Sequence, residues 1–412
     1  MKLSHTIVAA AIAALAGTSI AQIGSSSFHH RHKLKPAKPP QRPVPGAGAQ
    51  FGDPLSGLDA TNLQAFNDGR EEFEAVETPE GGLGPIFNDS SCVVCHSAGA
   101  TGGASAVTVT RFGRVSNGKF DPFEALGGSL LQRFTIAPEA QEKIPAQANV
   151  IAQRVATPLF GAGLIEAIPD GDILLNAQRR QPDGVHGRVS TVTDVTTGKT
   201  RVGRFGWKLQ QATLLAFAGD AYLNEMGVTS RFFPTENAPN GNQALLAKYD
   251  LVPDVEDAVD PATGKGDIDH AADFMRFLAP PPPVRMTASA LAGGNLFQQM
   301  QCTACHMPVM FTGPNPIAAL SHQPVPLFSD LLLHDMGSLG DGIEQGVAKG
   351  NEMRTAPLWG LRMRPRFLHD GRAATVADAI SAHAGEATAS ANRFKALKPA
   401  QRQQLLDYLN GI

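Results

Sequence analysis

All four cysteines of this chain lie in two copies of one motif, C-x-x-C-H. The motif side chains are Cys92, Cys95 and His96 in "SCVVCHSA", and Cys302, Cys305 and His306 in "QCTACHMP". Two thiols at this spacing, followed directly by an imidazole, are typical of covalent attachment of a c-type haem. The thiols add to the two vinyl groups of one porphyrin, and the histidine binds its iron.

Other uses of the thiols explain less of the pattern. A thioredoxin-like dithiol occurs in a βαβ context, which neither copy has. A four-cysteine zinc site usually places its two C-x-x-C pairs about 15–20 residues apart, whereas these pairs are roughly 200 residues apart. Neither zinc nor a pair of disulfides accounts for the two histidines. The sequence therefore predicts two covalently bound haem c groups, haem 1 at the first motif and haem 2 at the second.

The first 21 residues have the features of a secretory signal peptide. An apolar run, residues 7–16, is too short to span a bilayer. Ser19 and Ala21 then place small side chains before a cleavage point at Gln22. No later segment is long and apolar enough for a transmembrane helix, so we expect a periplasmic or secreted protein.

Composition predicts how the rest of the chain is divided. Residues 22–50 are rich in proline and basic side chains, which is typical of a flexible, disordered linker. Four consecutive prolines, residues 280–283, predict a stiff connection. They separate an expected N-terminal domain, residues 51–279, from a C-terminal domain, residues 284–412.

Helical patterns precede both motifs. Residues 63–73 and 288–301 place apolar side chains at helical spacing, and residues 398–412 do so again after Pro399. We expect the last helix to pack on the helix around Phe297, as in a cytochrome c domain. Residues 189–207 predict a β-hairpin. The expected fold is mainly α, with two cytochrome c-like haem domains, long loops and a small β-hairpin.

The axial partners of the two irons must come from the remaining side chains, because haem iron takes His, Met, Cys or Tyr. Six histidines remain beyond the linker: His186, His270, His322, His334, His369 and His383. Their contexts alone do not distinguish a ligand from a surface or structural histidine.

A family resemblance narrows the choice. The stretch "RTAPLWGLRMRPRFLHDGRAATVADAISAHAGEA", residues 354–387, resembles the C-terminal signature of bacterial di-haem cytochrome c peroxidases and of the methylamine-utilisation di-haem enzyme. It is closer still to the di-haem oxidoreductase family, often labelled thiol oxidoreductases. "GGLGPIFNDSSCVVCH", "GAGLIEAIPD" and "DLLLHDMGSLGDG" extend the resemblance over residues 51–412. The thiol label gains no support here, since no cysteine remains for dithiol chemistry.

The resemblance implies different surroundings for the two irons. It places the distal ligand of haem 2 at His383. It brings His369 towards the haem 1 propionates, and Arg372 is a further candidate for the propionates. The position of the peroxidases' movable distal histidine on haem 1 is Phe112 here. Haem 1 is therefore expected to have an open distal face, which can bind peroxide.

Two further roles are implied by the resemblance. Glu225 matches the distal acid/base of the peroxidases, and Trp207 matches their inter-haem relay. A glutamine common in the relatives is replaced by Phe217, which departs from the peroxidase pattern. Glu166 is the alternative acid.

These expectations describe a peroxidase-like oxidoreductase with a catalytic haem 1 and an electron-transfer haem 2. A small oxidant such as peroxide and an exported electron donor or acceptor protein would be its partners. The net charge of −3 implies no nucleic-acid partner. The alternatives are a di-haem electron carrier without substrate turnover and a protein-modifying oxidase. As in the relatives, a calcium ion (Ca²⁺) could lie between the haems.

Overall fold

The computed structural model describes residues 50–412. The expected signal peptide and all but the last residue of the expected linker lie outside the described residues. The described residues 50–412 belong to one compact unit. No helix within residues 50–412 has both the length and the hydropathy needed to cross a bilayer.

Helices are the commonest regular elements of the described chain, and most of them are short. Their bounds are α1 Ala60–Glu74, α2 Cys92–Cys95, α3 Ala162–Glu166, α4 Asp170–Ala177, α5 Leu214–Ala221, α6 Gln243–Tyr249, α7 Asp267–Phe277, α8 Ala288–Gln299, α9 Val376–Ser381, α10 Thr388–Ala396 and α11 Pro399–Gly411. A π-helical turn, η5 (Tyr222–Met226), continues α5. π-Turns of this kind often occur at functional sites.

Small antiparallel sheets complete the fold. The strands are β1 Ile86–Phe87, β2 Thr108–Ser116, β3 Lys119–Asp121, β4 Leu130–Leu131, β5 Phe134–Thr135, β6 Val150–Val155, β7 Thr191–Asp194, β8 Lys199–Val202, β9 Met310–Phe311, β10 Pro324–Val325, β11 Leu333–Asp335 and β12 Glu352–Arg354. The largest sheet pairs β2 with β3, β4 and β6. The predicted hairpin is confirmed as β7 and β8, and Gly198 adopts the positive φ of +68° that its turn requires.

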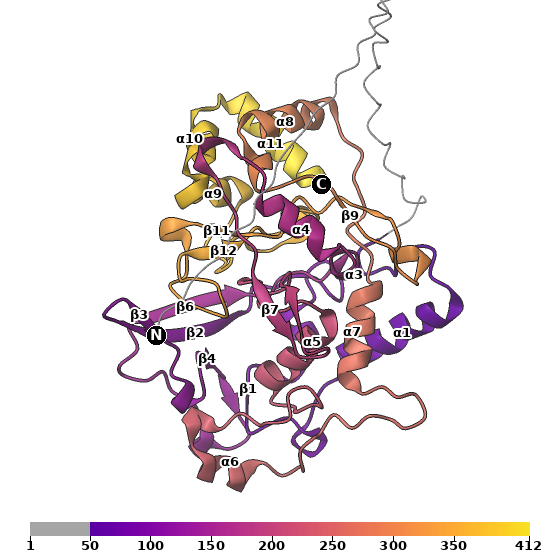
Figure 1. Ribbon diagram of the computed structural model, residues 1–412, viewed down its shortest axis with the longest axis vertical. Coiled ribbons are helices and arrows are strands. Elements are labelled where there is room, and N and C mark those ends of the chain that lie inside the picture. Colours follow the sequence, from indigo (N-terminus) through magenta and orange to yellow (C-terminus); the bar gives the residue numbers. More distant parts are fainter. Residues whose placement is uncertain (1–49) are drawn as a thin grey trace, which may run out of the picture. The chain divides into compact units, whose positions relative to one another are not determined.

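The predicted packing of the last helix on the helix before the second motif is confirmed (Figure 1). Thr287 caps α8, and Pro399 occupies the first turn of α11. The two backbones approach so closely at Gly293 that a Cβ there would lie 1.9 Å from the Gln404 carbonyl oxygen. Phe297 is buried in this contact, whereas Leu291 is exposed.

A second helix pair repeats this arrangement around the first motif (Figure 1). Asp59 caps α1, which packs against α7. Phe66 and Phe274 stack with ring centroids 5.4 Å apart, and Gly69 allows the close approach. Each motif therefore follows a helix that a later helix crosses. In both cases, apolar side chains of the helix pair pack against the motif.

Candidate active site

Two large cavities lie in the described chain, and each is lined by one C-x-x-C-H motif. Together with their mouths they enclose about 1260 Å³ and about 1340 Å³. All four cysteines are free thiols and half-buried, with no disulfide between them. We call them cavity 1, at the first motif, and cavity 2, at the second.

The motif histidines present the nitrogen that a metal would use. His96 Nδ1 faces the Gly103 carbonyl oxygen at 3.2 Å, and His306 Nδ1 faces the Phe328 carbonyl oxygen at 3.0 Å. A carbonyl only accepts, so Nδ1 donates and Nε2 stays available. Burial lowers the pKa of both histidines to about 4. Both rings are therefore neutral, which is the form that binds a metal.

Cavity 2 holds a second imidazole opposite the first. His383 follows α9, and its ring centroid lies 6.5 Å from that of His306. With metal–nitrogen bonds of about 2 Å, this separation leaves room for one ion between the two rings. His383 Nδ1 donates to the Ala379 carbonyl oxygen at 2.7 Å, which again leaves Nε2 available. Burial lowers the pKa of His383.

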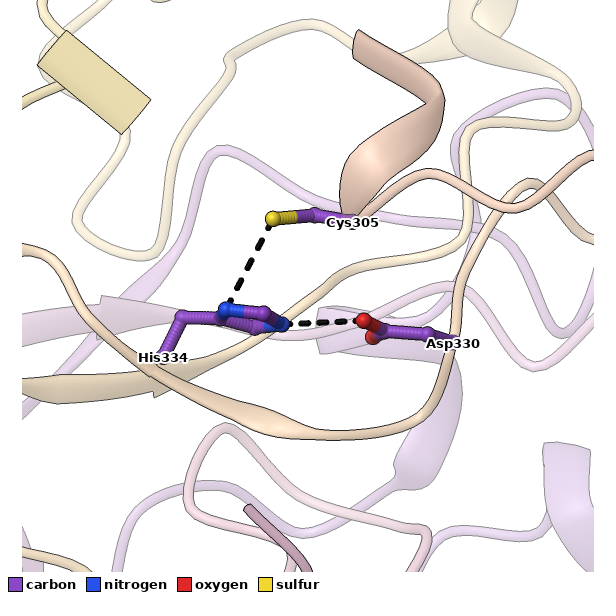
Figure 2. Close-up of side chains that lie close together, drawn as sticks. All are labelled: Cys305, Asp330 and His334. Atoms are coloured by element: carbon purple, nitrogen blue, oxygen red, sulfur yellow. Dashed lines mark hydrogen bonds and ion pairs between the residues drawn. The ribbon is translucent and has the colours of Figure 1, made fainter. Parts of the chain in front are cut away.

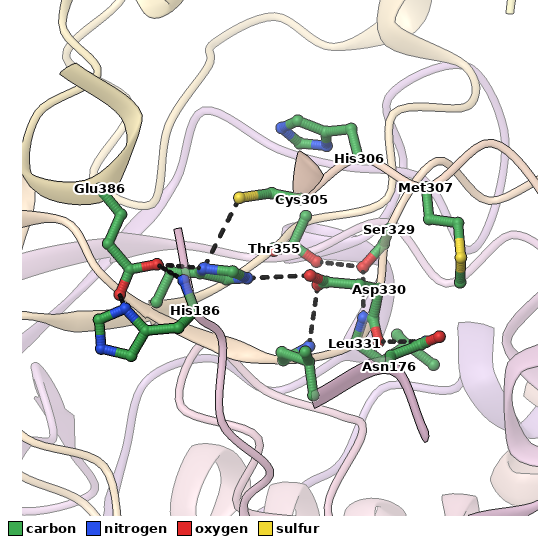
Figure 3. A network of polar contacts seen from close by, with 12 residues as sticks. Asn176, His186, Cys305, His306, Met307, Ser329, Asp330, Leu331, Thr355 and Glu386 are labelled. Carbon is green, nitrogen blue, oxygen red and sulfur yellow. Dashed lines mark hydrogen bonds and ion pairs between the residues drawn. The ribbon is translucent and has the colours of Figure 1, made fainter. Parts of the chain in front are cut away.

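His334 also lines cavity 2, but both of its nitrogens are committed. Nε2 lies 2.9 Å from Asp330 Oδ2, and Nδ1 lies 3.6 Å from Cys305 Sγ (Figure 2). Nδ1 also lies 2.8 Å from Glu386 Oε2. Glu386 also accepts from the His186 backbone N–H at 3.0 Å (Figure 3). Carboxylates on both sides require both nitrogens to donate.

His334 is therefore an imidazolium held in a buried ion-pair network, not a metal ligand. Burial opposes its charge, but hydrogen bonds to Asp330, Cys305 and Glu386 raise its pKa to about 12. Nitrogen and oxygen atoms of His334 and Asp330 lie within 4.8 Å of the Cys305 sulfur. A metal there would need a neutral imidazole. The network instead holds the segment beside the second motif.

Cavity 1 has only one imidazole in its lining, that of His96. Val109 and Arg111 of strand β2 line the cavity, together with Val107 just before the strand. Phe112 is buried on the other side, where its ring lies 6.1 Å from that of Phe123. The position where the peroxidases have their movable histidine thus holds an apolar core side chain. Cavity 1 differs from cavity 2 in lacking an imidazole across from the motif.

Glu225 lies in the wall of cavity 1, on the π-turn η5. Its backbone carbonyl accepts from the N–H groups of Asn88, at 2.7 Å, and Asp89, at 3.2 Å. The Asn88 amide also donates to Glu225 Oε2 at 2.8 Å. Burial raises the pKa of Glu225. A carboxyl group held this way can accept and return a proton.

A second buried acid in cavity 1, Asp220, is not apparent from the sequence. Asp220 lies on α5, five residues before Glu225. Its carboxylate accepts a hydrogen bond from the Asn224 amide at 3.0 Å, and burial raises its pKa. Phe217 lines the cavity one turn earlier. Glu166, the alternative acid, pairs with Arg276 at 3.1 Å and is absent from the lining. The structure brings Glu225, not Glu166, to the first motif.

Trp207 stands between the cavities. Of the described residues, it alone lines both. Its indole Nε1 donates to the Val155 carbonyl oxygen at 2.8 Å, which fixes the ring. On the side of cavity 2, the His369 ring centroid lies 6.2 Å away and the Arg354 guanidinium 5.8 Å away. One aromatic ring therefore connects the two sites.

Buried arginines face cavity 2 without counter-ions. Arg354 and Arg364 line it, and no Asp or Glu in the described chain pairs with either. Arg354 donates to the Arg204 carbonyl oxygen, and Arg364 donates to the Pro357 carbonyl oxygen. The Nε of each has no hydrogen-bond partner. Burial lowers the pKa of both to about 10. Two cationic groups aimed into one cavity fit a ligand that carries carboxylates.

The arginine chosen from the sequence lies elsewhere. Arg372 is exposed and pairs with Asp370, outside the lining of cavity 2. His369, which the resemblance placed towards the haem 1 propionates, lines cavity 2 and is absent from the lining of cavity 1. In cavity 1, Arg111 has an unpartnered Nε and Arg154 pairs with Asp341 at 2.7 Å. Sequence reasoning missed these lining arginines because nothing local separates a buried guanidinium from a surface one.

The donor sets fit haem c. Each cavity offers two free thiols, the neutral imidazole of its motif and guanidinium groups suited to propionates, and cavity 2 adds the imidazole of His383. A zinc site or a disulfide would not account for cysteine thiols followed by such a histidine in an apolar cavity as well as haem c does.

Comparison with known proteins gives one family match. Residues 137–412 match the family described as "Di-haem oxidoreductase, putative peroxidase". No curated relative matches the chain.

Similar solved structures share little sequence with the chain. A MauG-like protein associated with microbial copper homeostasis is 15% identical, with 90% of this chain and 95% of that chain covered, and a TM-score of 0.40. The diheme peroxidase BthA from Burkholderia thailandensis is 14% identical, with 86% of each chain covered, and a TM-score of 0.38. Kuenenia stuttgartiensis hydrazine synthase is 14% identical, with 95% and 99% covered, and a TM-score of 0.40.

Proposed function

The chain belongs to the di-haem oxidoreductase family, and from this premise we propose that it is an exported c-type enzyme that reduces peroxide at cavity 1 with electrons delivered through cavity 2. One observation supports this division of roles above all others. Cavity 1 has a single lining imidazole beside two buried acids, whereas in cavity 2 His383 faces His306 across 6.5 Å.

The residues of cavity 1 bind and protonate the substrate. Cys92, Cys95 and His96 would hold a haem, which would supply the redox chemistry that reduces peroxide. Glu225 takes the proton from one peroxide oxygen and returns it to the other, which promotes cleavage of the O–O bond. Peroxide, two electrons and two protons give two molecules of water. The raised pKa of Glu225 lets one carboxyl group perform both transfers.

The residues of cavity 2 hold a centre for electron transfer. Cys302, Cys305, His306 and His383 would hold this group, which would supply storage and relay of electrons. With both imidazoles committed to it, cavity 2 would leave no place for substrate. Trp207 is the side chain through which electrons cross to cavity 1.

The buried guanidinium groups complete this assignment. Arg354 and Arg364, with His369 beside them, hold the propionates in cavity 2, and Arg111 does so in cavity 1. The exported redox partner docks near cavity 2. Residues 51–279 and 284–412 would be two cytochrome c-like domains, since each contains one motif and one pair of crossed helices.

The visible spectrum of the oxidised protein tests the proposal. We expect one high-spin haem that changes on addition of peroxide and one low-spin haem that does not. An electron carrier without substrate turnover would show two low-spin haems that ignore peroxide. That result would remove the catalytic role.

Replacing Trp207 with phenylalanine should slow electron transfer between the haems. Phenylalanine has a smaller aromatic ring than tryptophan, so it provides less aromatic contact between the two cavities. Both motifs stay intact. Stopped-flow spectroscopy of the half-reduced protein after peroxide addition measures this rate. Trp359→Phe, at the other tryptophan, is the matched control, because Trp359 lies in the core outside both cavities. Equal rates in the two variants would contradict the relay.

A further inference from the structure

A cluster of three carboxylates lies apart from both cavities. Glu236, Asp254 and Glu256 each place an oxygen so that the three lie within 4.8 Å of one another. Asp254 and Glu256 come from the acidic loop that precedes α7, and Glu236 comes from the segment after η5. No lysine, arginine or histidine of the described chain forms an ion pair with any of them.

Glu236 makes this cluster different from an ordinary acidic surface. Its side chain is 6% exposed, and its buried Oε2 has no hydrogen-bond partner. Oε1 accepts only from the Asn237 backbone N–H at 3.1 Å. Burial, followed by the charge of Glu256, raises the pKa of Glu236 to about 9. A buried carboxyl oxygen without a donor is costly, so it points to a missing positive partner.

The other two carboxylates are held in place. Glu256 Oε2 accepts from the Thr229 backbone N–H at 2.6 Å, and Asp254 Oδ1 accepts from the Thr229 hydroxyl at 3.3 Å. Asp254 is exposed, so the cluster opens to solvent on its side. An ion can therefore enter without unfolding the loop.

We propose that Glu236, Asp254 and Glu256 bind one hard divalent cation of the calcium class. Oxygens within 4.8 Å of one another need only small side-chain movements to share one ion at the Ca²⁺–oxygen distance of about 2.3–2.6 Å. An all-oxygen, triply acidic site selects Ca²⁺, Mg²⁺ or Mn²⁺ over softer metals. Flexible geometry, with water filling the open side, suits Ca²⁺ better than octahedral Mg²⁺. This site is distinct from the calcium ion expected between the haems.

The position of the cluster suggests what the cation stabilises. A Cβ on Gly84 would lie 3.0 Å from Glu236 Oε1 and 2.6 Å from the Gly227 carbonyl oxygen. The Gly84 N–H donates to the Met226 carbonyl oxygen at 3.0 Å. The cluster thus adjoins the end of η5, the turn that carries Glu225. A bound cation would fasten the acidic loop to this segment.

The experiment measures binding of Ca²⁺ to the full-length holoprotein after removal of metals with a chelator. Isothermal titration calorimetry should show saturable binding, and Ca²⁺ should raise Tm. Glu236→Gln should weaken binding by at least about tenfold, because affinity follows the charge of the ligand set. Glutamine matches the neutral form of the buried acid, so this variant should fold. Glu344→Gln, at an exposed carboxylate away from the cluster, should bind Ca²⁺ as the wild type does.

Two outcomes would overturn the site. One is the absence of saturable Ca²⁺ binding in the wild type. The other is unchanged binding in both Glu236→Gln and Glu256→Gln. A second cluster of close carboxylates consists of Glu72, Glu77 and Asp267. The variant Glu77→Gln tests whether Ca²⁺ binds there instead. Loss of binding in that variant alone would place the ion in the second cluster and refute the proposal. Binding and Tm are read independently of peroxide turnover, so failure here leaves the proposed function standing.

Discussion

Replacing Glu225 with glutamine is expected to slow peroxide turnover by about 10²–10⁴-fold, the usual contribution of a positioned acid/base. Glutamine keeps the shape of the side chain and can still accept from the Asn88 amide, which donates to Glu225 at 2.8 Å. It cannot take up a proton. Haem content and spectrum should therefore stay unchanged while kcat/KM falls, as measured by oxidation of a reduced electron donor.

The pH dependence gives a second readout of the same group. Glu225 must be deprotonated to accept the peroxide proton, and burial raises its pKa above the ordinary value. Activity should therefore rise with pH through this raised pKa, and the Glu225→Gln variant should lose that limb. Asp220→Asn tests the neighbouring acid. Turnover close to wild type in Glu225→Gln, with loss in Asp220→Asn, would transfer the role to Asp220.

Replacing His383 with glycine should convert haem 2 from low spin to high spin. The side chain lies opposite His306 in cavity 2, and its removal leaves one axial position without a protein ligand. The space vacated by the ring should accept free imidazole. Visible and electron paramagnetic resonance spectra of the oxidised variant measure the change, and added imidazole should restore the low-spin signal.

The control for this variant is an exposed histidine. His322→Gly removes an imidazole at a position with a positive φ of +53°, which glycine adopts readily. Its spectrum should match the wild type. A low-spin haem 2 in His383→Gly without added imidazole would show that another side chain binds the iron.

Local patterns predicted the elements that hold the motifs. The helix ending near Gln299, the helix beginning at Pro399 and the hairpin turning at Gly198 all lie where the sequence placed them. Caps, turn residues and apolar spacing act over a few residues, so they can be read directly. The sheet built on β2 was not predicted. Its partner β6 lies about 40 residues further along, and such pairing depends on contacts that local spacing does not encode.

The candidate site divides in the same way. The spacing of thiols and imidazole in each motif was decisive alone, because haem attachment requires these groups to be neighbours in the chain. Glu225, Trp207 and His383 were selected through the family resemblance. The structure places all three in cavity linings and gives each a definite neighbour.

Burial and distance between remote segments were decided only by the tertiary structure. Arg354 and Arg364 look like ordinary surface arginines in the sequence, yet both are buried without a carboxylate partner. Arg372, chosen from its motif, remains at the surface. The chemistry of the two motifs was thus determined by the sequence itself, since covalent attachment depends on adjacent residues. The difference between an open and a filled cavity depends on which distant side chains the fold brings opposite each motif. The order of residues in the sequence does not by itself specify those contacts.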